Sequence, residues 1–205
     1  YTMDSSIIIT FAIPLFFGLI LIEFYYGVIT KQNNYRINDA ITSMSLGLIS
    51  RFVPILGLGF QYVVYKAVAE HYNFNLLNGE EIWVWVTAFV LYDVCYYWMH
   101  RIHHEIKVFW ATHVVHHHGE EFNLSTALRQ TSTGFLWKWV FFLPMFIIGI
   151  PPHIYVSVAG LNLVYQFWVH TEHIGRLGFL EYIFVTPSNH SCLLYTSPSP
   201  RDNGR

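Results

Sequence analysis

The feature of this sequence that most constrains its fold is a group of histidines in apolar, aromatic surroundings. Seven of its 12 histidines stand close together near the middle of the chain. In a helix, His100 and His104 are at positions i and i+4, so they share one face. His113, His116 and His117 have the spacing i, i+3 and i+4, which again places them on one face. Two such faces can converge on a metal ion, because neutral imidazole is a good ligand for iron, zinc or copper.

Other interpretations exist for any one of these histidines. An isolated histidine can be an interfacial anchor, and a surface histidine-rich tract can arise without a metal. Burial of this many imidazoles without partners is costly, however, and a metal satisfies several of them together. We therefore predict a metal site. The two cysteines, Cys95 and Cys192, do not form a zinc motif, so the predicted ligands are histidines, with carboxylates as the other candidates.

The composition indicates a membrane protein. Hydrophobic residues make up 54% of the 205 residues and charged residues only 12%, which is too apolar for an ordinary soluble domain. We predict an all-α fold, a multi-pass membrane helical bundle with a histidine-rich di-metal site at one membrane face. The net charge of −2 gives no basic footprint, so no nucleic-acid partner is expected.

Apolar segments define the predicted membrane helices. The first, residues 6–29, is long enough to cross a bilayer of roughly 30 Å at about 1.5 Å per residue. A signal peptide is the competing interpretation, but the run is too long and has no basic leader. Residues 39–69 are broken by proline and glycines and are predicted to form a kinked or re-entrant helix. The next span, residues 82–99, runs directly into His100.

The last two apolar segments are predicted to form a helical hairpin. Residues 134–150 and 153–169 are each just long enough to span, and two consecutive prolines separate them. Such a hairpin returns His170 to the membrane face that carries Arg129 and the other histidines. His170 is therefore expected to lie near the first two groups of histidines.

Asp93 is a candidate for positioning a metal ligand. It precedes His100 by about two helical turns and therefore shares its face. We expect the carboxylate to orient a ligand histidine, as second-shell carboxylates commonly do. A hydrogen bond to a tyrosine is the alternative.

Several strings of residues carry a resemblance to a known family. They include Asn-Leu-Ser-Thr-Ala-Leu-Arg-Gln at 123–130, Gln-Phe-Trp-Val-His-Thr-Glu at 166–172 and Thr-Pro-Ser at 186–188 with His190. Together with the histidine pairs described above, they make the chain resemble the fatty acid hydroxylase superfamily of membrane di-iron hydroxylases and desaturases. The resemblance covers most of residues 39–190.

The resemblance implies roles for particular residues. The expected iron ligands are His100, His104, His113, His116, His117, His170 and His190. Three histidines fall outside the pattern and are expected to be unliganded neighbours at the rim of the site: His103, His118 and His173. The candidates for catalytic contacts to the ligands or to a cofactor are Glu105, Glu120, Asn123 and Glu172.

The resemblance also implies an activity. Within the superfamily, the strings at 123–130 and 166–172 are most similar to the glyceryl-ether mono-oxygenases. Such an enzyme uses a di-iron centre, O2 and electrons from tetrahydrobiopterin to hydroxylate the ether-linked carbon of a lipid in the endoplasmic reticulum membrane, and the product collapses to an aldehyde and a glycerol. The expected partners are thus the bilayer, a glyceryl ether and O2.

Two other functions stay open at this point. One is a sterol desaturase, methyl oxidase or fatty acid hydroxylase that takes electrons from cytochrome b5. The other is a non-enzymatic membrane metal-binding protein or metal transporter. Transport needs ionisable ligands spread along a path through the bilayer, whereas these histidines cluster at the ends of the predicted spans, which favours a fixed site.

The residues after His190 depart from the superfamily. Its members continue with two more histidines, in the pattern His-x-x-His-His-Gly, but this sequence reads Ser191-Cys192-Leu. Residues 192–202 back-translate to a common sequencing-library adapter, so we interpret them as foreign to the native protein; a Ser/Pro-rich flexible tail is the alternative. We expect the polypeptide as written to have an incomplete two-metal site and to be inactive. The predicted division is 1–38 as an N-terminal membrane helix and linker, 39–190 as a fatty acid hydroxylase-like domain incomplete at its end, and 191–205 as the tail.

Overall fold

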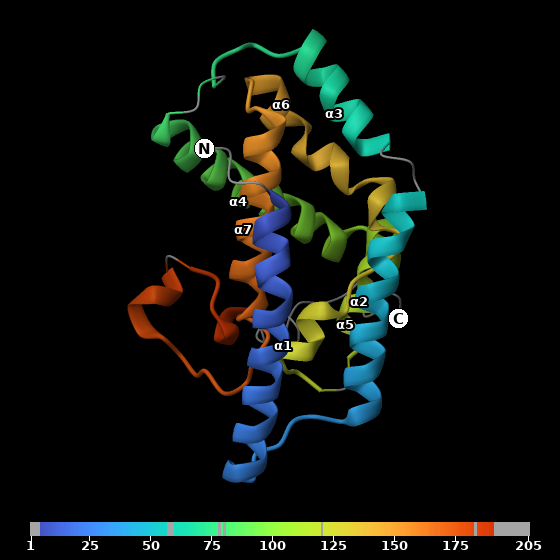
Figure 1. The fold of residues 1–205 in the computed structure, drawn as a ribbon, viewed down its shortest axis with the longest axis vertical. Helices are drawn as coiled ribbons and strands as arrows, with labels where there is room; N and C mark the ends of the chain where they lie inside the picture. The colour runs from blue at the N-terminus through green and yellow to red at the C-terminus, as the bar shows by residue number, and fades with distance from the viewer. Residues whose placement is uncertain are drawn as a thin grey trace.

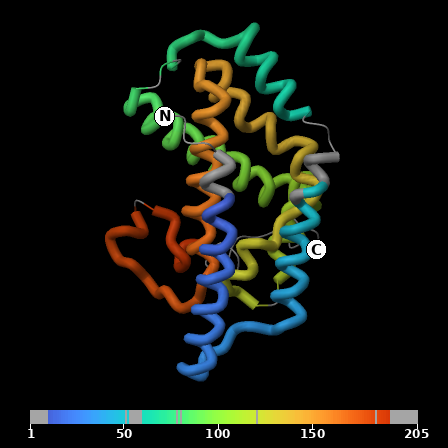
Figure 2. Tube along the Cα trace, in the orientation of Figure 1, coloured from blue at the N-terminus to red at the C-terminus, as the bar shows by residue number. Residues whose placement is uncertain are grey.

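The computed structural model contains helices and no strands in the part of the chain that it describes (Figures 1 and 2). The described residues are 5–56, 60–77, 79, 81–119, 121–182 and 184–190. The predicted all-α class is confirmed for these residues. The predicted tail, residues 191–205, lies outside them.

The described chain contains seven α-helices and four short 3-10 helices, labelled η. In chain order they are α1 (Ser5–Thr30), α2 (Ile37–Leu56), α3 (Phe60–His71), α4 (Ile82–Glu105), α5 (Lys107–His117), η1 (Leu124–Leu128), η2 (Gly134–Leu136), η3 (Lys138–Phe142), α6 (Leu143–Ile148), α7 (Pro152–Phe167) and η4 (Gly178–Tyr182). The segment predicted as one kinked helix, residues 39–69, is thus formed by α2 and α3.

Two helices of the described chain are long and apolar enough to cross a membrane. They are Thr10–Thr30 within α1 and Ile82–Glu105, which is α4. Both present large hydrophobic side chains outward, such as Leu21 on α1 and Trp83 and Val90 on α4. Such surfaces are unfavourable in water and suit contact with lipid chains.

The predicted single helix over residues 134–150 is wrong. This segment is divided into η2, η3 and the short α6. Its first half is rich in aromatic side chains, which lose rotamer freedom in an α-helix. Pro144 also has no N–H to donate and would clash with the carbonyl of Val140 in a continuous helix, so α6 begins only at Leu143. Gly149 then ends α6 with a φ of +113°, a conformation that favours glycine.

The predicted hairpin connection is nevertheless present. Helix α7 begins at Pro152, where a proline is tolerated because the first N–H groups of a helix have no partner within it. The helix packs against both α4 and α1 (Figure 1). Between α4, α6 and α7 lies a buried apolar core, in which the rings of Tyr92 and Phe142 stack at 4.8 Å. This core fixes the direction in which α7 carries the chain towards His170.

The break between α4 and α5 brings two histidine-bearing helices together. Ile106 adopts an extended conformation, with φ −106° and ψ 122°, and its N–H donates to the carbonyl of Ile102 to close α4. Helix α5 starts at the next residue and folds back against α4. A single extended residue therefore turns one predicted histidine-rich segment into two facing helices.

The carboxylate of Glu23 attaches α1 to the rest of the bundle. Glu23 is buried, and its oxygens accept hydrogen bonds from the hydroxyls of Tyr35 and Thr171 and from the backbone N–H of Leu124, the last at 2.8 Å. These donors satisfy a charge that would otherwise be costly to bury. Because Thr171 follows His170, the same contacts connect α1 to the candidate metal site.

Candidate metal centre

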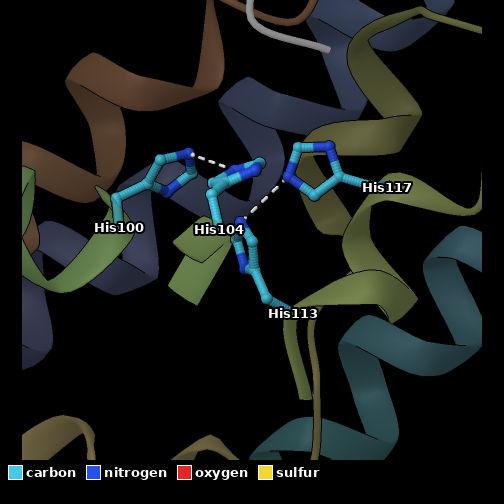
Figure 3. Close-up of side chains that lie close together, drawn as sticks. All are labelled: His100, His104, His113 and His117. Carbon is cyan, nitrogen blue, oxygen red and sulfur yellow. Dashed lines mark hydrogen bonds between the residues drawn. The ribbon is translucent and has the colours of Figure 1, made fainter. Parts of the chain in front are cut away.

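The first histidine cluster lies between α4 and α5. It consists of His100 and His104 from α4 and His113 and His117 from α5, each of which offers a ligand nitrogen within 4.8 Å of the others (Figure 3). The Nε2 atoms of His100 and His104 are 3.2 Å apart, and those of His113 and His117 are 2.9 Å apart. The i, i+4 spacing on each helix therefore places two imidazoles one above the other, as expected from the sequence.

The second cluster combines residues that are far apart in the sequence. His116 from α5, His170 from the segment after α7 and His190 have ligand nitrogens within 4.8 Å of one another. The sequence grouped His116 with His113 and His117, but the structure separates it from them. At 3.6 residues per turn, His116 is rotated by about 60° from His113 and points to the neighbouring cluster, whereas His117 is rotated by only about 40°.

The two clusters adjoin. The ring centroids of His113 and His116 are 5.6 Å apart, and those of His100 and His190 are 6.2 Å apart. All seven histidines that the resemblance implied as ligands are thus brought to two neighbouring positions. This arrangement suits two metal ions side by side.

Hydrogen bonds to backbone carbonyls determine which nitrogens face the second cluster. Nδ1 of His116 is 2.9 Å from the carbonyl oxygen of Arg129, and Nδ1 of His170 is 3.0 Å from that of Gln166. A carbonyl can only accept, so each Nδ1 carries the proton and each Nε2 presents a lone pair. These two Nε2 atoms lie 3.1 Å apart. Neither Nε2 carries a proton to donate to the other, and a cation between them would accept both lone pairs.

The protein environment keeps these imidazoles neutral. Burial is the main cause, and it lowers the pKa of His116 to about 4, that of His190 to about 3 and that of His117 to about 2. Positive charge on the neighbouring histidines of the clusters acts in the same direction for His117 and His190. Neutral imidazole is the form that binds metal ions, so the histidines need not lose protons before binding at neutral pH.

An apolar cavity of about 690 Å³ reaches both clusters. The histidines at its inner end include His100, His113, His116, His170 and His190. Its outer walls come from α1, α2 and α7, with side chains such as Phe16, Met44 and Leu163. The cavity can therefore hold an apolar chain with one end beside the metal-binding nitrogens.

None of the described carboxylates that were predicted to act at the site belongs to either histidine cluster. Glu105 is exposed and pairs with Arg101 at 2.8 Å on the outer surface of α4. Glu172 is also exposed. Asp93 is exposed on α4, on the side near Asn162 of α7. Glu120 lies outside the described residues.

Asn123 is buried, but its polar atoms serve the local fold. Its side-chain oxygen accepts from the backbone N–H and the hydroxyl of Ser125, which caps η1, and its amide donates to the carbonyl of Asn34 at 2.7 Å. The structure thus assigns it a positioning role for η1, close to Arg129.

The three histidines outside the family pattern differ in their surroundings. His118 is exposed, and His173 is partly buried against Tyr26. The expectation of a position at the rim is wrong for His103, which is only 1% exposed and lines the cavity. Its place on α4 follows from the helical period, because position 103 is rotated by about 60° from His100 towards the interior.

Two further residues at the site were not assigned a role from the sequence. Lys138 lines the cavity, and Glu23 braces the segment that carries His170. In the sequence, each is a single charged side chain within an apolar run, and that pattern could have marked both as functional candidates.

Comparisons with known proteins agree with this geometry. A family profile described as fatty acid hydroxylase matches residues 85–192. The alkylglycerol monooxygenase of Danio rerio is 42% identical over 180 residues, which cover 87% of this chain and 40% of that protein. The alkylglycerol monooxygenase of Homo sapiens is 41% identical with the same two coverages, and that of Caenorhabditis elegans is 31% identical over 82% of this chain and 33% of its own length. The chain therefore spans about 40% of the length of the first two relatives. No solved structure matches it.

Proposed function

Because the chain belongs to the fatty acid hydroxylase family, we propose that it acts as a membrane di-iron mono-oxygenase that hydroxylates the ether-linked carbon of glyceryl ethers. The observation that carries this proposal is the opening of two adjoining all-histidine clusters into one apolar cavity. The printed names of the relatives, alkylglycerol monooxygenase, support the substrate class. The proposed location is the endoplasmic reticulum membrane, with more than one membrane span.

The residues of the two clusters fit iron. The ligand set is entirely imidazole, and the paired Nε2 atoms, 2.9 to 3.2 Å apart, have the separation of two nitrogens that share one metal ion at roughly 2.1 Å. Zinc binds imidazole equally well but has no redox chemistry. Bound iron would supply the activation of O2 for insertion of one oxygen atom into a C–H bond. The ligands would be His100, His104, His113 and His117 for one ion and His116, His170 and His190 for the other.

The side chains of this protein position the substrate and exclude water. The cavity wall from α1, α2 and α7 binds the alkyl chain through apolar contacts, since Phe16, Met44 and Leu163 offer no polar atoms. The carbonyls of Arg129 and Gln166 keep the protons of His116 and His170 on Nδ1, away from the metal-binding side. Burial of the clusters keeps competing water from the reacting carbon.

The proposed reaction balances with tetrahydrobiopterin as the electron donor. One atom of O2 enters the C–H bond beside the ether oxygen, and the other leaves as water with two electrons from the pterin and two protons. The hemiacetal then collapses to a fatty aldehyde and a glycerol. The described structure shows no contact between the clusters and Asn123, Glu105 or Glu172. We therefore propose that these residues contribute to the reaction only through the residues beside them.

The proposal is tested by an activity assay with each candidate electron donor. The assay uses two proteins, the 205-residue chain and a version extended along its native message beyond the codon for His190. Both are purified in detergent and loaded with Fe(II). The expected result is aldehyde release from 1-O-hexadecylglycerol by the extended protein with tetrahydrobiopterin. His116→Ala should abolish it, and His71→Ala, at the exposed end of α3, should not.

The outcomes separate the alternatives. Turnover of a sterol or fatty acid with cytochrome b5 and not with the pterin would favour the desaturase or fatty acid hydroxylase function. Iron binding without oxidation of any lipid by either donor would favour a non-enzymatic metal-binding protein.

A further inference from the structure

Two basic side chains that line the apolar cavity lie outside both metal clusters. They are His103 of α4 and Lys138, the first residue of η3. The two helices pack against each other, and the ring of His103 lies 6.0 Å from that of Phe141 on the same 3-10 helix as Lys138.

His103 lines the cavity and carries a buried acceptor that nothing in the described protein satisfies. Its Nδ1 is 2.6 Å from the carbonyl of Met99, so Nδ1 carries the proton and Nε2 carries the lone pair. Nε2 is buried, without a hydrogen-bond partner, and outside both metal clusters. Phe109 and Phe141 flank the ring and hold it in place. Buried acceptors in proteins normally have a hydrogen-bond partner, so a ligand that donates a hydrogen bond to this Nε2 would satisfy it.

Lys138 presents a donor to the same cavity. Its aliphatic stem lies directly over Gly134, where even a methyl group would come within 2.7 Å of Cε. Gly134 therefore leaves room for the stem of this cavity-lining residue. Among the described residues, no carboxylate forms an ion pair with Lys138. A partly buried lysine without an acidic partner can be satisfied by an acceptor on a ligand.

We propose that Lys138 and His103 bind the glycerol end of the substrate, with one hydroxyl donating to Nε2 of His103 and an oxygen accepting from Nζ of Lys138. The proposal rests on the proposed function, which places a glyceryl ether in this cavity. A fatty acid carboxylate would satisfy Lys138 but has no proton for His103 at neutral pH. An alkane satisfies neither residue. A glycerol end supplies both a donor and acceptors.

The position of the pair suits the chemistry. His103 contacts the cluster residue His113, with ring centroids 5.7 Å apart. The ether-linked carbon is only a few bonds from the glycerol hydroxyls, so a glycerol held here leaves that carbon beside the clusters. The alkyl chain then extends along the apolar walls of the cavity. The pair would act as a specificity determinant, while the metal ligands remain those described above.

A competition-binding experiment tests this inference on the 205-residue chain in detergent micelles. The probes are 1-O-hexadecylglycerol, palmitate, cholesterol and hexadecane, each used to displace a fluorescent alkyl ligand from the metal-free protein. The variants are Lys138→Met, Lys138→Arg and His103→Phe. The matched controls are Lys107→Met and His71→Phe, which change exposed residues. Co(II) absorption of the histidine clusters reports whether each variant retains the metal-binding fold.

The wild-type chain should bind the glyceryl ether more tightly than hexadecane, palmitate and cholesterol. Lys138→Met and His103→Phe should each weaken binding of the glyceryl ether by about tenfold, the effect of one buried hydrogen bond to a polar or charged group, and leave hexadecane unchanged. Lys138→Arg should retain most of the preference, and the two controls all of it.

The results that would contradict the substrate class differ from those that would contradict the roles of Lys138 and His103. A wild-type preference for palmitate, cholesterol or hexadecane over the glyceryl ether would overturn the proposed substrate class and this inference together. A wild-type preference for the glyceryl ether that Lys138→Met retains in full would overturn the inference alone. If His103→Phe loses the Co(II) spectrum, the Lys138 variants decide the question, because position 138 lies outside the clusters.

Discussion

The guanidinium group of Arg129 lies 2.8 Å from the carboxylate of Asp39, and both side chains are about nine-tenths buried. The same guanidinium donates to the carbonyl of Val115 on α5 at 2.9 Å, while the backbone carbonyl of Arg129 accepts from His116. One residue therefore joins α2 to α5 and fixes the tautomer of His116, a member of the second cluster. This contact connects the stability of the bundle to the geometry of the second cluster.

Removing one partner of this pair should be strongly destabilising. We expect Asp39→Ala to lower the free energy of unfolding by roughly 3–5 kcal/mol, because it leaves a buried guanidinium unpaired. Thermal unfolding in detergent measures the loss. The pair of Arg36 and Glu121, also at 2.8 Å but with Arg36 64% exposed, provides the control: Glu121→Ala should cost at most about 1 kcal/mol. Equal losses for the two substitutions would contradict the structural role of Asp39.

Replacing Glu23 should weaken the second cluster from a distance. Glu23→Gln puts an amide donor where the carboxylate receives the hydroxyls of Tyr35 and Thr171, and the lost and opposed hydrogen bonds should cost about 2–3 kcal/mol. Because Thr171 follows His170, we also expect weaker Co(II) binding by the second cluster. Titration of Co(II) absorption measures it, with Glu70→Gln on the exposed face of α3 as the control. Unchanged Co(II) affinity would show that α1 does not brace His170.

The two histidine clusters should lose metal independently. We expect His113→Ala to weaken metal binding at the first cluster by at least tenfold and His170→Ala to do so at the second, since each variant leaves the other ligand set complete. Metal content by mass spectrometry and the Co(II) spectrum distinguish the two losses. A single cooperative loss of all metal in both variants would indicate one shared site.

Acid should destabilise the metal-free protein. His116, His117 and His190 have folded-state pKa values below 6.5, so the unfolded state takes up protons first as the pH falls through about 6.5. Stability is therefore complete above that pH and is lost below it. Between pH 7.5 and 5.5 each residue should cost roughly 1.4 kcal/mol. Melting temperatures at several pH values measure the slope, and His116→Phe should make it shallower; a flat profile in the wild type would contradict the burial of neutral imidazoles.

A close approach of backbones should make one glycine irreplaceable. An added Cβ at Gly47 of α2 would lie 2.4 Å from the carbonyl oxygen of Leu128, so Gly47→Ala should push η1 away from α2 and cost about 1–3 kcal/mol. Gly18→Ala on α1, where nothing lies within 4 Å, is the control and should cause no loss. Thermal unfolding compares the two variants. Full stability of Gly47→Ala would mean that η1 can shift without consequence.

The sequence was informative where the structure depends on local spacing. The pairs His100 with His104 and His113 with His117 follow from the period of a helix, and each pair does meet in the first cluster. The length of two apolar runs also predicted α1 and α4, because such runs have few alternatives. The position of His170 beside His116 followed from the hairpin, although residues 134–150 are not one helix.

The rest depended on contacts between distant segments. The helical period can turn His116 away from His113, but no local pattern indicates that it meets His170 and His190, which come from distant segments. The surroundings of the carboxylates also depend on such contacts. Glu105 is next to a ligand in sequence, but the helix directs it outward to Arg101, while Glu23, far away in sequence, reaches the site.

Because the extended residue Ile106 separates α4 from α5, the two clusters should form at different stages of folding. The first cluster needs only α4 and α5, which are consecutive, so its four imidazoles can meet as soon as this short local hairpin forms. The second needs His116 to find His170, 54 positions further along. Local contacts cost little loop-closure entropy and form early, whereas distant ones form late. The first cluster can thus assemble on a nascent chain, whereas the second closes only when the segments that carry His170 and His190 dock, so a metal ion bound at the second cluster would hold the finished bundle together.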